Sequence, residues 1–243
     1  DRAPATRRGA FLAEALVLAA TTEYLGATGV QAGGVLAFLS SRVLGQYEVF
    51  GTGGRLLLVA LGPLTNIALA LRRAPDIAAR IRRIVLMGGA YFEVGNVTPA
   101  AEFNIYVDPV AAAEVFASGV DLVVVPLDVT HRALTNRAWV ETMRGQGRVG
   151  AVVASWTDFF ERYDRAKYGH EGAPLHDPCA VAYLIAPELF SGRRINVEIE
   201  TEGRFTRGMT VADWWRVTGR PANALFLRDV DRDGLFTLLG QRI

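Results

Sequence analysis

Short apolar runs alternate with helical patterns along most of the chain. Residues 55–61, 84–87 and 121–127 are continuous apolar stretches, and Gly62-Pro63 and Gly88-Gly89 close the first two. Runs of this length bounded by turn residues are typical of strands buried on both faces. We therefore predict three parallel strands at these positions.

Helical patterns separate these runs. Residues 64–73 have a helical pattern that stops at Ala74-Pro75. Asp108-Pro109 opens an alanine-rich helix, with Asp as N-cap, Pro in the first turn and Gly119 near its end. Alternation of this kind predicts an α/β fold with a mostly parallel sheet flanked by helices. Ligands of such folds bind at the carboxyl ends of the strands.

Helices dominate the chain after residue 136. We predict helices over residues 137–143, 149–168 and 231–239, and another that His176-Asp177-Pro178 opens and that runs to Ala186. Residues 195–200 and 204–211 alternate like a hairpin, and residues 224–229 form the last strand candidate. Because no repeat or linker interrupts the pattern, we interpret residues 1–243 as a single domain.

Composition narrows the possible partners and compartments. The 243 residues are 51% hydrophobic and 21% charged, with a net charge of +1, which argues against a nucleic-acid partner. One cysteine, Cys179, excludes an internal disulfide framework, and a reducing cytoplasm is the simplest interpretation. No apolar run is long enough to span a membrane. Residues 9–20 resemble a short secretory leader, but Glu14 interrupts them.

The loop over residues 88–104 is the most informative candidate site. It is longer than most such connections and carries Asn96, Glu102 and Asn104. A carboxylate accepts hydrogen bonds and an amide both donates and accepts them, which suits a ligand rich in hydroxyls. The alternative is a surface loop with ordinary polar residues.

Other polar residues also follow predicted strands. Thr65-Asn66 follows the first strand, and Asp128, Thr130 and His131 follow the third. In His176-Asp177-Pro178 the aspartate is either a helix cap or a ligand for a hard cation such as calcium, and the histidine could act as an acid. Asp108 fits a cap better than a ligand, and Trp214-Trp215 fits packing better than base stacking.

Several sequence blocks resemble the inosine-uridine preferring nucleoside hydrolases. The resemblance extends from about residue 35 to residue 243, with its blocks in order. These are residues 58–66 (Leu-Val-Ala-Leu-Gly-Pro-Leu-Thr-Asn), 85–89 (Val-Leu-Met-Gly-Gly), 95–96 (Gly-Asn), 101–104 (Ala-Glu-Phe-Asn), 108–109 (Asp-Pro), 127–131 (Leu-Asp-Val-Thr-His), 176–183 (His-Asp-Pro-Cys-Ala-Val-Ala-Tyr) and 207–213 (Arg-Gly-Met-Thr-Val-Ala-Asp).

The resemblance implies a nucleoside hydrolase fold with a Rossmann-like sheet and assigns roles to seven residues. Asn96, Glu102 and Asn104 would hold the ribose hydroxyls, and Met87 would line the sugar pocket. Asp177 would bind both calcium and ribose, and the backbone carbonyl of Leu61 would be another calcium ligand. His176 would protonate the departing base.

The implied reaction is hydrolysis of the N-glycosidic bond of a purine or pyrimidine ribonucleoside by a calcium-activated water. The resemblance also implies a homo-oligomer, either a dimer or a tetramer. Base preference cannot be assigned, because the segment expected to contact the base, residues 163–170 with Tyr163 and Tyr168, does not align.

The aspartate cluster with which members of this family begin has no counterpart in this sequence. Before Asp108 the only aspartates are Asp1 and Asp76. We therefore expect the first strand and its aspartate loop to be absent and the calcium site to be incomplete. A truncated or misassembled product, a partner chain that completes the site, and a divergent member that binds nucleoside or ribose without turnover all stay open.

Overall fold

The computed structural model describes residues 56–169 and 171–243, which divide into two compact units. One unit holds the central sheet and includes residues 56–129 and 191–229; the other is mostly helical and includes residues 130–169, 171–190 and 230–243. The expectations for residues 9–20, for Arg55 and for His170 lie outside the described residues. The interpretation as a single domain stays a prediction.

Parallel strands form the core of the sheet unit. The described strands are β1 (Leu56–Ala60), β2 (Ile81–Met87), β3 (Leu122–Val125), β4 (Phe190–Ile195) and β7 (Ala224–Val230), in the order β1-β2-β3-β7-β4. The pairs β1–β2, β2–β3 and β3–β7 are all parallel. All four residues of β3 are buried, as its continuous apolar sequence predicts. The predicted α/β fold with a mostly parallel sheet is confirmed.

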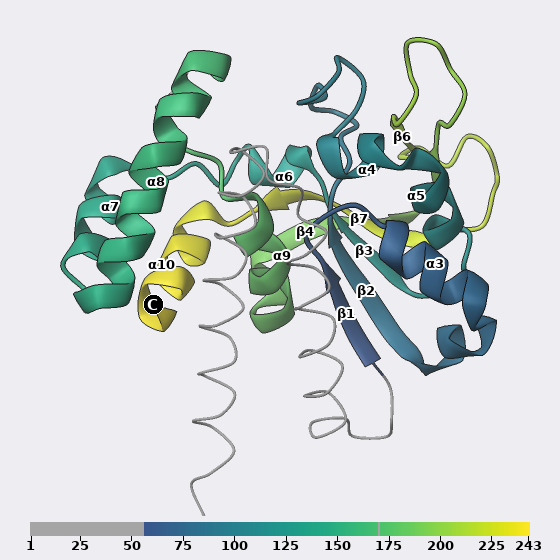
Figure 1. Cartoon of the computed structure of the whole chain (residues 1–243), viewed down its shortest axis with the longest axis horizontal. Helices are drawn as coiled ribbons and strands as arrows, with labels where there is room; N and C mark the ends of the chain where they lie inside the picture. Colours follow the sequence, from purple (N-terminus) through teal and green to yellow (C-terminus); the bar gives the residue numbers. More distant parts are fainter. Residues whose placement is uncertain (1–55, 170) are drawn as a thin grey trace, which may run out of the picture. The chain divides into compact units, whose positions relative to one another are not determined.

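Helices α3 (Thr65–Arg73) and α5 (Pro109–Phe116) pack on this sheet (Figure 1). The 3-10 helix η1 (Pro75–Arg80) follows α3. Their apolar side chains join those of β2 and β3 in one hydrophobic core. Asp108 caps α5 by accepting a hydrogen bond from the backbone N–H of Ala111, as predicted, and also accepts one from Thr65 Oγ1 at 2.7 Å.

A two-stranded antiparallel ribbon, β5 (Val197–Ile199) with β6 (Thr210–Ala212), lies in the same unit. The hairpin predicted for residues 195–200 and 204–211 is wrong at its bounds, because Ile195 belongs to β4 and the residues before Thr210 form turns. β4 was not predicted, because its four middle residues are exposed and only its two ends are buried, so no apolar pattern marks it.

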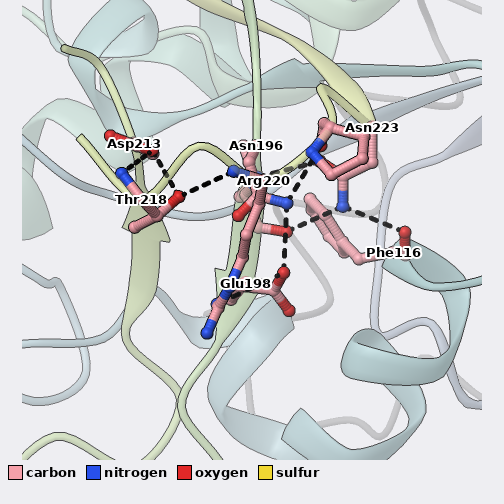
Figure 2. A network of polar contacts seen from close by, with 9 residues as sticks. Phe116, Asn196, Glu198, Asp213, Thr218, Arg220 and Asn223 are labelled. Carbon is pink, nitrogen blue, oxygen red and sulfur yellow. Dashed lines mark hydrogen bonds and ion pairs between the residues drawn. The ribbon is translucent and has the colours of Figure 1, made fainter. Parts of the chain in front are cut away.

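Asparagine side chains fix the ribbon within its unit (Figure 2). Asn223 accepts a hydrogen bond from the backbone N–H of Val197 at 2.8 Å and donates to the carbonyls of Val197 and Phe116. Asp213, which follows β6, accepts hydrogen bonds from the backbone N–H and the hydroxyl of Thr218. The ribbon is therefore tied to the end of α5 by directional hydrogen bonds.

The helical unit contains α7 (Arg137–Arg144), α8 (Gly147–Tyr168), α9 (His176–Ile185), the 3-10 helix η2 (Pro187–Leu189) and α10 (Arg232–Arg242). These helices agree with the predicted ones to within three residues at each end. Tyr163 and Tyr168 lie on the last turns of α8, and Gly169, with a φ of +75°, is its C-cap. Among the described residues, no helix combines the length and apolar character needed to cross a membrane.

Candidate functional site

Glu102 is the buried centre of the loop that follows β2. It is 2% exposed and is the N-cap of α4 (Phe103–Val107). Its Oε1 accepts a hydrogen bond from the backbone N–H of Asn104 at 2.9 Å, and its Oε2 accepts from those of Gly89 at 3.0 Å and Ile105 at 3.2 Å. The carboxyl group thus joins the start of the loop to the start of α4.

Burial also changes the acidity of this group. It raises the pKa of Glu102 to about 7, against the opposing effect of the hydrogen bonds from the backbone N–H groups of Asn104, Gly89, Ile105 and Phe103. Because a carboxyl oxygen has two acceptor positions, the hydrogen bond from the Asn104 N–H leaves Oε1 with a second position. That position can accept a hydrogen bond from a ligand hydroxyl.

Asn104 lies two residues after Glu102 in the sequence, and its side chain contacts Met87, the last residue of β2. The side-chain amide of Asn104 donates to the backbone carbonyl of Met87 at 3.0 Å, and its nitrogen lies 3.6 Å from Met87 Sδ. Both side chains are buried, at 8% and 3% exposure. No described residue donates a hydrogen bond to Asn104 Oδ1, so this oxygen can accept from a ligand.

Asn96 takes part in the same loop through the backbone. Its Oδ1 accepts a hydrogen bond from the N–H of Phe103, the first residue of α4, at 2.9 Å. The structure therefore brings Met87, Glu102 and Asn104 into contact and links Asn96 to them through Phe103. Their assignment as ribose ligands stays a prediction.

Asp128 fixes the first part of the loop. It is 2% exposed, and its carboxylate accepts from the backbone N–H groups of Tyr91 at 3.1 Å, Phe92 at 2.7 Å and Glu93 at 3.3 Å. Burial raises the pKa of Asp128 above its ordinary value. The position of Asp128 after a strand marks it as a candidate, but this clamp depends on contacts more than thirty residues apart in the sequence.

His176 belongs to a cluster in the helical unit. Its Nδ1 lies 2.7 Å from Thr130 Oγ1, and its ring centroid lies 5.7 Å from that of His131. The His131 ring makes an edge contact with Tyr168. Burial, with His131 and Lys167 nearby, lowers the pKa of His176 to about 3, so the free protein holds this ring neutral at pH 7. A neutral imidazole can still donate one hydrogen bond.

Asp177 is buried in the first turn of α9, at 3% exposure. The alternative in which Asp177 caps this helix is wrong, because the N-cap is Leu175 and the helix begins at His176. A carboxylate in a first turn still interacts favourably with the positive end of the helix dipole.

The described residues do not form a calcium site by themselves. Calcium takes about six to eight oxygen ligands, mostly carboxylates and carbonyls. Within residues 56–169 and 171–243, no three His, Cys, Asp or Glu side chains gather closely enough to hold a metal ion. The Asp177 carboxylate and the Leu61 carbonyl supply too few oxygens, so their assignment as metal ligands and the bound Ca²⁺ stay predictions.

Comparisons with known proteins extend over most of the chain. The family model described as "Inosine-uridine preferring nucleoside hydrolase" matches residues 23–237. An uncharacterized protein of Schizosaccharomyces pombe is 50% identical over 191 residues, which cover 78% of this chain and 62% of that protein. The pyrimidine-specific ribonucleoside hydrolase RihA of Klebsiella pneumoniae is 50% identical over 188 residues, which cover 76% of this chain and 60% of RihA.

A solved structure of a ribonucleoside hydrolase is also similar to this chain. The purine-preferring ribonucleoside hydrolase of Gardnerella vaginalis superimposes with a TM-score of 0.71 at 36% identity, over 77% of this chain and 60% of that protein. The chain thus spans less than two thirds of the length of each of these relatives.

Proposed function

Because the chain belongs to the inosine-uridine preferring nucleoside hydrolase family, we propose that it contributes the ribose-binding part of an enzyme that hydrolyses the N-glycosidic bond of ribonucleosides. The observation that carries this proposal is the contact between Glu102, Asn104 and Met87 at the end of β2. An acceptor on Glu102 Oε1 and another on Asn104 Oδ1 lie at the strand end where α/β folds bind ligands.

Two acceptors side by side suit a vicinal diol. Each ribose hydroxyl donates one hydrogen bond, and acceptors held by buried backbone contacts lose little freedom when ribose binds. Asn96 would complete this group as the third ribose contact, and Met87 would form the apolar wall. His176, Asp177 and the backbone carbonyl of Leu61 keep the catalytic and calcium-binding roles that the family likeness implies, as part of the proposal.

A second candidate function follows from the incomplete calcium site. Within the described residues no three His, Cys, Asp or Glu side chains gather closely enough to hold a metal ion, whereas the Glu102 carboxyl group and the Asn104 amide lie at the end of β2. A protein with these features would bind ribose or nucleoside without turnover. Both candidates use the same sugar-binding residues and differ only in the reaction.

Ribose release from inosine and from uridine, measured with calcium and with a chelator, separates the two. Calcium-dependent release supports the hydrolase. Binding of ribose in a calorimeter without release supports the non-catalytic candidate, and neither release nor binding contradicts both. Both substrates are needed because one relative is named pyrimidine-specific and another purine-preferring.

Substitution of Asn104 tests the proposed site directly. Asn104→Ala removes one acceptor and should weaken ribose binding about tenfold, the usual effect of one lost hydrogen bond. Asn136→Ala is the control, because the Asn136 side chain also forms a hydrogen bond with the backbone, as an acceptor, but at the start of α7. Asp177→Ala should reduce any ribose release; unchanged release would contradict its catalytic role.

The same family likeness motivates three proposals about context. We propose a small-molecule nucleoside as the ligand, a homo-oligomer of two or four chains, and the cytoplasm as the compartment. Sedimentation of the purified chain tests the oligomer.

A further inference from the structure

Thr210, in the first position of β6, lies against the glycine that binds Glu102. Gly89 has a φ of +87°, and a Cβ placed on it would come within 2.7 Å of Thr210 Oγ1 and 3.3 Å of Thr210 Cβ and Cγ2. Thr210 is 1% exposed. Its side chain therefore limits how far Gly89 can move away from the Glu102 carboxyl group, to which the Gly89 N–H donates at 3.0 Å.

Gly208 makes a second contact at the other end of the same loop. It has a φ of +83°, and a Cβ placed on it would lie 2.9 Å from Tyr106 Cα and 3.2 Å from Ala101 Cβ. Its backbone N–H donates to the carbonyl of Glu200 at 2.6 Å. Gly208 and Thr210 thus lie against the loop at Ala101 and Gly89, and Gly208 also lies against α4 at Tyr106.

The ribbon that carries Thr210 is itself held in place. Thr210 pairs with Ile199 of β5, and Asn223 ties Val197 of β5 to Phe116 at the end of α5 (Figure 2). Directional hydrogen bonds thus hold the ribbon in which Thr210 lies against Gly89.

The hydroxyl of Thr210 has no hydrogen-bond partner within the described part of the chain. A buried hydroxyl without a partner destabilises a protein, so the hydroxyl does not account for the packing of this residue. The shape of the Thr210 side chain accounts for its packing, and a valine side chain has the same shape.

We propose that Thr210, together with Gly208, is a positioning residue that holds Gly89 and the start of α4 so that Glu102 and Asn104 face the ribose hydroxyls. The inference rests on the proposed function for its ligand, but the positioning itself can be measured without a ligand.

Two measurements on the purified chain test this role. The first follows the titration of the Glu102 carboxyl carbon by NMR, with thermal unfolding as a check on folding. The second measures the affinity for ribose by calorimetry. The variants are Thr210→Ala, Thr210→Ser, Gly208→Ala and Thr210→Val, and the control is Val211→Ala, a partly exposed neighbour in the same strand.

Thr210→Ala should move the Glu102 titration to higher pH, because the carboxylate loses the Gly89 N–H. Gly208→Ala should move it in the same direction, because the added methyl group displaces Ala101 and Tyr106 on either side of Glu102. Both variants should weaken ribose binding about tenfold. Thr210→Ser should have a smaller effect of the same sign and serves as the informative variant if Thr210→Ala does not fold. Thr210→Val should match the wild type in both measurements, and so should Val211→Ala.

An unchanged Glu102 titration in Thr210→Ala and Gly208→Ala would overturn the inference, as would an equal change in Thr210→Val or Val211→Ala. If the wild type does not bind ribose, the proposed function fails, while the Glu102 titration alone still decides the positioning role.

Discussion

Thr130 Oγ1 and His176 Nδ1 lie 2.7 Å apart, and both residues belong to the helical unit. Thr130 is fully buried, in the short helix α6 (Leu127–Thr130) that follows β3, and His176 is the first residue of α9. A single hydrogen bond thus connects two segments that are 46 residues apart in the sequence. It also fixes the orientation of the imidazole ring.

Thr130→Val should lower the free energy of unfolding by about 1–3 kcal/mol, because it leaves the partly buried His176 nitrogen without this hydrogen bond. Thr157→Val is the matched control. Thr157 is also buried in this unit, but its hydroxyl donates to a helix carbonyl, so the substitution should change stability by less than about 0.5 kcal/mol. Urea unfolding at pH 7 measures both, and equal midpoints would contradict the role of the Thr130 hydroxyl.

The sequence predicts the types of the elements well, but it does not fix the residue at which each helix begins. Asp108-Pro109 and Asp177-Pro178 look alike, yet Asp108 is a cap and Asp177 lies inside a first turn. Since the first backbone N–H groups of a helix have no internal partner, proline fits several positions of a first turn. The pattern therefore predicts that a helix starts nearby without fixing the residue.

The candidate site was predictable only as a set of residue types. Polar residues after the strands mark Asn96, Glu102 and Asn104, but the cap made by Glu102 depends on α4 beginning at Phe103. Thr210 is more than one hundred residues from Glu102 and has no local signal of a role. Contacts at such separation depend on packing, which the periodicity of a sequence does not encode.

The acidity of Glu102 predicts how stability depends on pH. Its pKa is about 7 in the folded chain and 4.5 as the ordinary value, so the folded state binds more protons between these pH values. Its contribution to stability is therefore fully present below pH 4.5 and is lost as the pH rises through about 7. The difference between the two pKa values corresponds to about 3 kcal/mol in the free energy of unfolding.

Comparison of the wild type with Glu102→Gln isolates this effect. Urea unfolding from pH 4.5 to pH 8 should show the wild type losing about 3 kcal/mol relative to the variant. Glu188→Gln, at an exposed position, should leave the pH profile of the wild type unchanged. A constant difference between wild type and Glu102→Gln would show that Glu102 is not buried as described.

Asp128→Asn should loosen the first part of the loop. An amide can accept the hydrogen bonds of Phe92 and Glu93, but its NH₂ group would then face the N–H of Tyr91, where two donors meet. We expect a loss of about 2 kcal/mol in unfolding free energy and faster hydrogen exchange at residues 91–93. Asp76→Asn, at an exposed position, is the control, and equal exchange in both variants would contradict the clamp.

Gly89 and Gly119 provide a matched pair of substitutions, because both have positive φ, at +87° and +76°. A Cβ on Gly119 meets no atom within 4 Å, whereas one on Gly89 meets Thr210 Oγ1 at 2.7 Å. Gly119→Ala should thus cost about 1 kcal/mol from its backbone conformation alone. Gly89→Ala should lower the free energy of unfolding by more than about 2 kcal/mol, since Thr210 must also be displaced.

Gly89→Ala should also weaken ribose binding, because the Gly89 N–H moves away from Glu102, while Gly119→Ala should not. Urea unfolding and calorimetry measure these effects, and equal losses in the two variants would mean that Thr210 yields freely and does not hold Gly89.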